Sequence, residues 1–147
     1  MAADLVFIDT NVLVAASVAG HPSHAVAQAF LARLTDAGGI ACISSQVCRE
    51  FLVVLTRGVL QGRSFTVTEA LEVLDEWRSN CTVLDENDAV LPELLELVRR
   101  HEVKGKQIHD ANIVATMQAN AIARLATLNA ADFKRYEGAV LLESLVS

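Results

Sequence analysis

The chain has 147 residues, with 18 Asp and Glu against 12 Lys and Arg, so its formal net charge is −6. Its hydrophobic fraction of 52% and charged fraction of 20% lie on the apolar side of the globular average. This composition argues against disorder, a coiled coil, a collagen-like repeat and a disulfide scaffold. The length indicates one domain spanning residues 1–147. The acidity opposes a simple electrostatic grip on nucleic acid, unless the acids are gathered in one place.

The cysteines and the first residues bear on the cellular compartment. Cys42, Cys48 and Cys81 have no C-x-x-C spacing, and we expect them to be small buried side chains in a reducing cytosol. The N-terminal segment has no basic region and contains Asp4 and Asp9, so it does not resemble a secretion signal. No apolar run approaches the roughly 18 residues that a membrane span needs. We therefore expect a cytoplasmic protein with no membrane partner.

Short apolar runs alternate with segments of helical periodicity along the whole chain. In chain order, the pattern predicts a strand at 5–8, helices at 11–19 and 23–34, a strand at 40–43, helices at 45–57 and 66–77, a strand at 81–84, a helix at 88–101, a polar loop at 103–107, a helix at 108–121, a strand at 123–128, a short helix at 130–136 and a strand at 139–142. This alternation predicts a mainly parallel five-stranded sheet that helices cover on both faces.

Two acids follow predicted strands. Asp9 comes after the first strand and Asp132 follows the fourth, and ligands of open parallel sheets bind at the carboxyl ends of strands. A purely structural role is open for both. Asp9 can cap the next helix, and Asn129 with Asp132 three residues on resembles a capping box.

Two further acids lie early in predicted helices. Glu50 falls at the edge of an apolar stripe, where it can also simply reach water or pair with a base. Asp110 shares one helical face with Ile113, Val114 and Met117, so a carboxylate is aligned with the core side of its own helix. Burying an unpaired carboxylate is expensive, so Asp110 needs a cation or a crevice.

These four acids can point into one crevice, because helices that follow parallel strands start at the carboxyl edge of the sheet. Several carboxylates together cannot all ionise without a cation. Mg²⁺ or Mn²⁺ suits an all-carboxylate site, and the absence of His and Cys from the set argues against zinc. The implied chemistry is attack of a metal-activated water on a phosphodiester.

At these positions the sequence resembles the PIN-domain ribonucleases, in particular the small stand-alone toxins of VapC type. The matching segments follow the family's order and spacing, and they are Phe7-Ile8-Asp9-Thr10-Asn11, Ser45-Gln46-Val47-Cys48-Arg49-Glu50-Phe51, Ile108-His109-Asp110-Ala111 and Thr127-Leu128-Asn129-Ala130-Ala131-Asp132-Phe133. The resemblance implies a three-layer α/β/α fold. It also implies that Asp9, Glu50 and Asp110 bind Mg²⁺ or Mn²⁺ and that Asp132 completes the acidic, catalytic set.

The resemblance also implies supporting residues and partners. Thr10 and Thr127 would position the metal, its waters or the scissile phosphate, with Asn11 and Asn129 beside them. Many relatives have an acid where this chain has Asn129, a departure that bears on the fourth ligand and on any second metal. Toxins of this family cut structured RNA, commonly tRNA or ribosomal RNA, form homodimers, and are silenced by an antitoxin protein.

Basic residues precede Asp110. Arg99, Lys104 and Lys106 are either a solvated helix end and loop or a rim that contacts RNA phosphates.

Two other functions are open. A non-catalytic PIN-like binding module would keep the fold without turnover. An Asp-dependent phosphatase would use Asp9 as nucleophile, but the second acid that such enzymes need two residues on is Asn11 here.

Overall fold

The computed structural model describes residues 4–146, so the first three residues of the acidic N-terminal segment lie outside the described part. The elements, in chain order, are β1 (Leu5–Ile8), α1 (Thr10–Ser17), α2 (His24–Asp36), β2 (Ile40–Ser44), α3 (Ser45–Thr56), β3 (Val59–Leu60), β4 (Arg63–Ser64), α4 (Val67–Asn80), β5 (Thr82–Leu84), α5 (Val90–His101), α6 (Gln107–Ala119), β6 (Arg124–Ala126), the 3₁₀ helix η1 (Ala130–Tyr136) and β7 (Leu141–Leu142).

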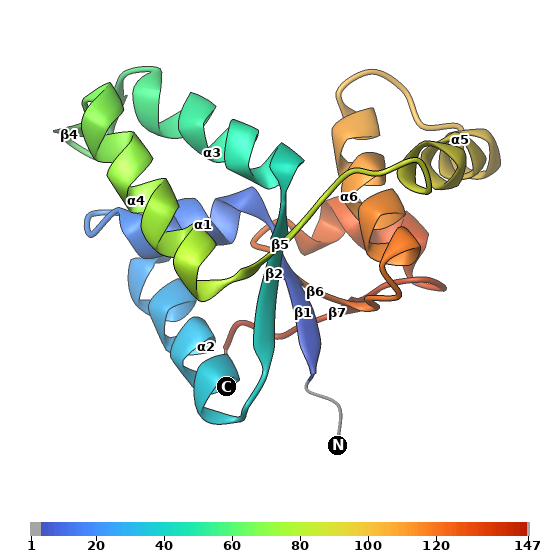
Figure 1. Ribbon diagram of the computed structural model, residues 1–147, viewed down its shortest axis with the longest axis horizontal. Helices are drawn as coiled ribbons and strands as arrows, with labels where there is room; N and C mark the ends of the chain where they lie inside the picture. The colour runs from blue at the N-terminus through green and yellow to red at the C-terminus, as the bar shows by residue number, and fades with distance from the viewer. Residues whose placement is uncertain (1–3, 147) are drawn as a thin grey trace.

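Five strands form one sheet in the order β5-β2-β1-β6-β7, and every neighbouring pair is parallel. Helices α1 to α4 lie on one side of this sheet, and α5, α6 and η1 lie on the other (Figure 1). The architecture is therefore the three-layer α/β/α fold predicted from the sequence.

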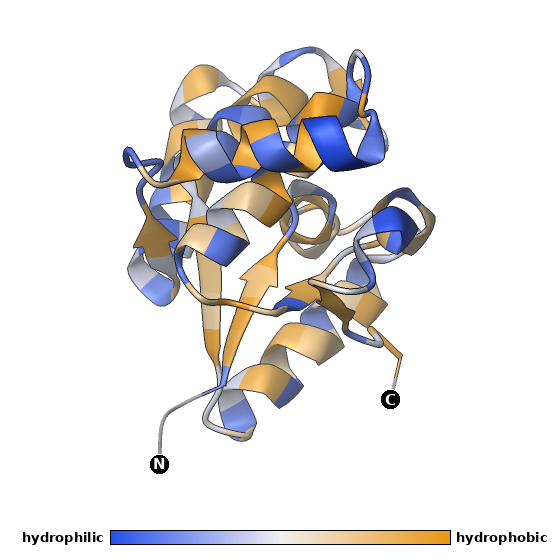
Figure 2. Ribbon diagram, turned by 90° about the vertical axis from the view of Figure 1, so that its right-hand side faces the viewer, coloured by the Kyte–Doolittle hydropathy of each residue, from blue (hydrophilic) through white to orange (hydrophobic). Residues whose placement is uncertain are grey.

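The central strand β1 shows why these residues form a covered sheet. Val6, Phe7 and Ile8 are fully buried, as expected for a strand with helices on both faces. Figure 2 shows the strands of the sheet as mainly hydrophobic, whereas the outer helices carry both hydrophobic and hydrophilic residues. The core thus runs along both faces of the sheet, and polar side chains are left to the edges.

Two local predictions need correction. The fourth and fifth sheet strands are shorter than predicted, because β6 ends at Ala126 and β7 begins at Leu141. The hairpin β3–β4 was not predicted, and its turn places Gln61 and Gly62 at φ values of 51° and 77°. Such consecutive positive φ values are typical of a type I′ turn, which Gln-Gly signals less clearly than Asn-Gly.

Side chains cap two of the helices at their first turns. Ser44 accepts a hydrogen bond from the amide of Val47 and begins α3, and Thr66 forms a full capping box with Glu69 at the start of α4. In the described part of the chain the three cysteines are free, and no helix is long and apolar enough to cross a bilayer.

Candidate active site

Asp9 lies at the carboxyl end of the central strand, as predicted. Its backbone amide donates to the carbonyl of Ala126 at 3.0 Å, so it continues the pairing of β1 with β6. Asp9 is also the N-cap residue of α1, and only 7% of its surface is exposed. The chain therefore places a carboxylate in the interior of the fold, at the edge where parallel sheets bind ligands.

Three donors hold the Asp9 carboxylate. The Thr10 amide donates to Oδ1 at 2.8 Å, and Oδ2 accepts from Thr127 Oγ1 at 2.8 Å and from Asn11 Nδ2 at 3.2 Å. Burial raises the pKa of Asp9 to about 6, although the bonds from Thr127 and Thr10 act in the opposite direction and the Glu50 charge adds to the rise. The carboxylate is thus oriented firmly but is short of positive charge.

The supporting residues of the sequence prediction join the β1–α1 turn to the β6–η1 turn. Thr127 Oγ1 accepts from Asn11 Nδ2 at 3.3 Å and from the Asn129 amide at 3.0 Å, and the Leu128 amide donates to Asn11 Oδ1 at 3.0 Å. Hydrogen bonds therefore join the β1–α1 and β6–η1 turns, which are distant in sequence, around Asp9.

Glu50 approaches Asp9 from α3. Its Oε1 accepts a hydrogen bond from Thr10 Oγ1 at 3.0 Å, so Thr10 contacts both acidic positions, one through its amide and one through its hydroxyl. Glu50 is partly buried, while Phe51 and Val47 of the same helix are fully buried. The predicted place at the edge of an apolar stripe is confirmed.

Asp110 lies in the first turn of α6 and is partly buried. Burial is the largest cause that raises its pKa to about 6, followed by the negative charges of Asp9, Asp132 and Glu50, while His109 opposes the rise. The other three predicted acids are therefore close enough to influence Asp110.

Two adjoining pockets share Asp110. The first has a volume of about 370 Å³, and its lining includes Asp9, Thr10, Asn11, Glu50, Asp110 and Asn129. The second has a volume of about 310 Å³, and its lining is Lys106, Gln107, Asp110, Ala131, Asp132, Arg135 and Tyr136. The structure thus brings Asp9, Glu50 and Asp110 together in one pocket and places Asp132 in the next.

Asp132 and Asn129 depart from the expectation that four acids share one crevice. Asp132 is exposed in η1, and it does not occur among the described residues that line the pocket of Asp9. The capping-box alternative is wrong within the described chain, because no side-chain bond caps η1. Asn129 instead contributes to the wall of the first pocket, at the position where the resemblance expects an acid.

The basic residues divide into two groups. Lys106 lines the pocket of Asp132, whereas neither Arg99 nor Lys104 occurs among the described residues of the two pockets. Arg99 forms an ion pair with Glu96 at 2.7 Å on α5. Arg135 was not predicted as a site residue, but it lines the pocket beside Lys106 and follows Asp132 by three residues. Its position after the predicted fourth strand was the available signal.

The donor set suits a hard divalent cation. Carboxylates and hydroxyls are the ligands that Mg²⁺ and Mn²⁺ prefer, and a cation would offset the burial and the mutual repulsion that raise the pKa values of Asp9 and Asp110. Among residues 4–146, however, no three His, Cys, Asp or Glu side chains are already grouped as a metal site. The chemistry of the residues fits a metal, and their side chains would have to close around it.

Comparison with known proteins identifies the family. The family model for the PIN domain matches residues 6–139, so the chain belongs to the PIN-domain family. It is similar to Ribonuclease VapC24 of Mycobacterium tuberculosis (strain CDC 1551 / Oshkosh), with 28% identity over 123 residues, 83% of this chain and 84% of that protein. Within the family, the chain thus resembles the VapC type.

Solved structures have the same fold. VapBC2 from Rickettsia felis, bound to a DNA fragment from its promoter, has a TM-score of 0.70 at 22% identity, with 95% of this chain and 97% of that chain covered. VapC20 of Mycobacterium tuberculosis, described as a sarcin-ricin loop cleaving toxin, has a TM-score of 0.62 at 21% identity, with 82% and 86% covered. At these identities the similarity extends to the fold.

Proposed function

We propose that the protein is a Mg²⁺- or Mn²⁺-dependent endoribonuclease that acts as the toxin of a toxin–antitoxin pair. The observation that carries the proposal is the buried carboxylate of Asp9, held by three donors and sharing a pocket with Glu50 and Asp110 on a PIN fold. A buried acid without a cation partner is unfavourable, so its retention at a ligand-binding edge points to function.

The roles of the residues follow from their contacts. Asp9, Glu50 and Asp110 would hold the cation, with Asp132 at the edge of the set, and a bound divalent ion supplies Lewis acidity and a more acidic water for phosphodiester hydrolysis. Thr10 orients Glu50, and Thr127 orients Asp9. Lys106 and Arg135 border the acidic centre, where cations can hold the RNA phosphates on either side of the cut.

The test of catalysis uses Asp9→Asn and Asp110→Asn proteins. We expect both to lose cleavage of total RNA in Mg²⁺ or Mn²⁺ and both to keep a cooperative thermal transition. Mapping of 5′ ends in total RNA, with Asp9→Asn as the control, would give the cut site and would distinguish tRNA from ribosomal RNA. Unchanged cleavage by both variants would overturn the acidic-site assignment.

The proposal of an antitoxin partner rests on the similarity to VapBC proteins and on a pocket along α3. The solved relatives include VapBC complexes, and in this chain a pocket of about 440 Å³ runs along α3 past Val53, Val54 and Arg57 to Glu50. An antitoxin tail with apolar residues and an Arg aimed at Glu50 would suit this lining. We also propose a homodimer, which light scattering of the purified protein would test.

A neighbouring reading frame for a small DNA-binding antitoxin provides the genetic test. We expect expression of this chain alone to arrest growth, co-expression with that neighbour to restore it, and Asp9→Asn to be harmless. Growth arrest by Asp9→Asn would separate toxicity from nuclease activity and contradict the toxin proposal.

The non-catalytic binding module stays open because no metal group is preassembled among the described residues. Mn²⁺ that raises the thermal midpoint without any RNA cleavage would favour this second function. The phosphatase alternative has no such support, since the Asn11 side chain donates to Asp9 where a second acid would be needed.

A further inference from the structure

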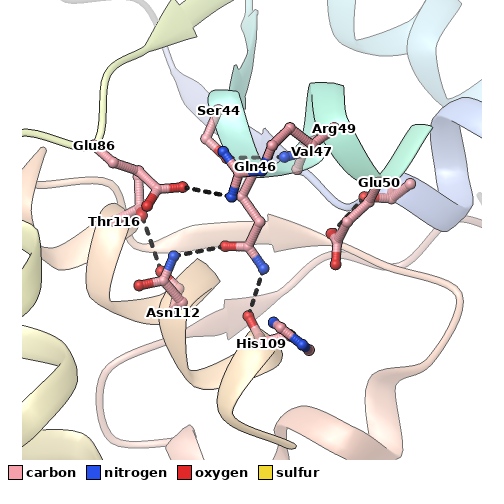
Figure 3. A network of polar contacts seen from close by, with 10 residues as sticks. Ser44, Gln46, Val47, Arg49, Glu50, Glu86, His109, Asn112 and Thr116 are labelled. Atoms are coloured by element: carbon pink, nitrogen blue, oxygen red, sulfur yellow. Dashed lines mark hydrogen bonds and ion pairs between the residues drawn. The ribbon is translucent and has the colours of Figure 1, made fainter. Parts of the chain in front are cut away.

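Gln46, which received no role in the sequence analysis, is almost completely buried at the carboxyl edge of the sheet, with 3% of its surface exposed. It is the second residue of α3, directly after β2. Both ends of its amide form hydrogen bonds. Nε2 donates to the carbonyl of His109 at 2.8 Å, and Oε1 accepts from Asn112 Nδ2 at 2.8 Å (Figure 3).

These two bonds connect opposite layers of the molecule. Helix α3 belongs to the layer of α1 to α4, and α6 belongs to the layer on the other side of the sheet (Figure 1). Within residues 4–146, they are the hydrogen bonds that join α3 to α6. Gln46 therefore bridges the two layers directly above the sheet edge that bears the acids.

The bridge lies next to the acids themselves. Glu50 is four residues after Gln46 on α3, which places the two side chains on the same face one turn apart. His109, whose carbonyl accepts the bond from Gln46, immediately precedes Asp110. Each end of the bridge is thus within one helical turn of an acid in the shared pocket.

The two helices differ in how their first turns are held. The buried hydroxyl of Ser44 caps α3 by accepting from Val47. In the described chain, no side chain caps α6, whose N-cap residue is Lys106 and which follows Gly105 at a φ of 58°. The bonds of Gln46 therefore let the capped helix α3 hold the first turn of the uncapped helix α6. That turn bears Asp110, which is close to three other negative charges.

The fold itself does not depend on this bridge. Ala111, Ile113, Val114 and Met117 bury the remaining face of α6 in the core, and α6 packs along α5. Loss of two amide bonds should therefore leave the helix in place as a whole but loosen its first turn.

We propose that Gln46 is a positioning residue that fixes the first turn of α6, and with it Asp110, at a set distance from Glu50. The proposal rests on the metal-dependent function proposed above. It explains why a pair of hydrogen-bonded amide side chains, rather than apolar contact, occupies the interface behind the acids. Groups that orient metal ligands in this way commonly change metal affinity by 10- to 100-fold.

The test compares three proteins. Gln46→Met keeps the side-chain volume and removes both bonds, and Asn112→Leu removes one bond but keeps the one to His109. Gln28→Met is the matched control, because Gln28 Nε2 also joins two helices by donating to a backbone carbonyl, that of Ala16 at 2.6 Å, away from the acids.

Hydrogen exchange of the metal-free proteins is the first measurement. We expect Gln46→Met to exchange the amides of residues 108–112 at least several-fold faster than the wild type, with Asn112→Leu intermediate and Gln28→Met unchanged. Equal protection in Gln46→Met and the wild type would overturn the proposal. This result does not depend on whether the protein cleaves RNA.

Mn²⁺ titration and steady-state kinetics are the second and third measurements. We expect Gln46→Met to bind Mn²⁺ about ten-fold more weakly, and to lower kcat by a similar factor with KM for RNA within two-fold of the wild type. Faster exchange with unchanged Mn²⁺ affinity would reduce Gln46 to a structural contact and refute positioning. Failure of the wild type to bind Mn²⁺ would refute the proposed function instead.

Discussion

At the scale of single residues, Asp9 combines burial with a raised pKa, and this predicts a specific dependence on pH. The pKa of Asp9 rises from an ordinary 3.8 to about 6 in the folded protein, chiefly because of burial. The folded state then holds the proton more tightly than the unfolded chain does. Asp9 therefore favours folding most below pH 4, and this contribution is lost as the pH rises through about 6.

The corresponding variant is Asp9→Asn in metal-free buffer. We expect it to be more stable than the wild type at pH 7.5, by an amount of the order of 2–3 kcal/mol, which corresponds to several degrees in Tm. The difference should narrow at pH 5, where the wild-type carboxyl is mostly protonated when folded. Thermal melts of both proteins in a chelator at the two pH values test this. A difference that does not change with pH would contradict it.

The basic residues beside the acids give a second prediction. Lys106 and Arg135 line the pocket of Asp132, so Lys106→Ala and Arg135→Ala should each raise KM for RNA several-fold with little change in kcat. Each should also reduce the slope of log affinity against log salt by about 0.7, the value for one phosphate of a single strand.

The control for these variants is Arg78→Ala, which removes an exposed arginine that pairs with Asp75 at 3.1 Å on α4. We expect no change in KM from it, and smaller changes from Arg99→Ala and Lys104→Ala than from Lys106→Ala. An equal loss from Arg78→Ala would mean that overall charge, rather than a local contact with RNA, decides affinity.

What the sequence can predict at this scale depends on charge and position. Asp9 and Asp110 were candidates from the sequence because Asp9 follows a buried strand, where parallel sheets bind ligands, and Asp110 lies on the apolar face of its helix. Gln46 offers no such signal. Its partner Asn112 is 66 residues away, and only the folded chain shows that the two amides meet.

At the scale of elements, the start of α4 is fixed by a capping box. Thr66 Oγ1 accepts from the Glu69 amide at 3.1 Å, and Glu69 Oε1 accepts from the Thr66 amide at 2.9 Å. Thr66→Ala should therefore reduce the free energy of unfolding by about 1 kcal/mol, or roughly 2–4 °C in Tm, without an effect on RNA cleavage.

Thr68→Ala is the control for this prediction. Thr68 is a neighbouring threonine, and it is exposed in the second position of α4. We expect its removal to leave Tm nearly unchanged. A larger loss of stability from Thr68→Ala than from Thr66→Ala would contradict the observed cap.

The hairpin β3–β4 shows what local patterns cannot reveal. Its strands have two residues each, and Val59 is 74% exposed. Periodicity needs longer segments to be recognised, and a strand without a buried face leaves no alternation to read. By contrast, β1 and β2 were predictable because uninterrupted apolar runs of this length favour strands covered on both faces.

At the scale of the whole molecule, the parallel sheet followed from the alternation of strands and helices, but the strand order did not. The order β5-β2-β1-β6-β7 places β1 in the centre and β5 at the edge, although β5 precedes β6 along the chain. The alternation alone does not say on which side of β1 each later strand pairs. This order is what brings Asp9, Glu50 and Asp110 to one pocket.

The net charge of −6 is also a property of the whole molecule, and four acids account for most of it. Without Asp9, Glu50, Asp110 and Asp132, 14 acids face 12 bases, so most of the excess negative charge belongs to the proposed metal site. The remaining surface is nearly neutral. We therefore expect RNA binding to be weak without a divalent cation and to depend on local bases.

A titration of the whole protein with Mg²⁺ or Mn²⁺ tests this reading of the charge. A cation that binds only the folded state stabilises it by about 2.7 kcal/mol at 100 times its dissociation constant. Tm should therefore rise with the logarithm of cation concentration and reach several degrees above the metal-free value. Asp110→Asn should abolish most of the rise in Tm, whereas Glu72→Gln, which changes an exposed acid of α4, should retain it.

NaCl at matched ionic strength separates site binding from general screening, because screening acts on all exposed charges alike. If NaCl reproduced the effect of Mg²⁺, or if Asp110→Asn retained it, the charge of −6 would be a property of the surface and the metal site would be refuted.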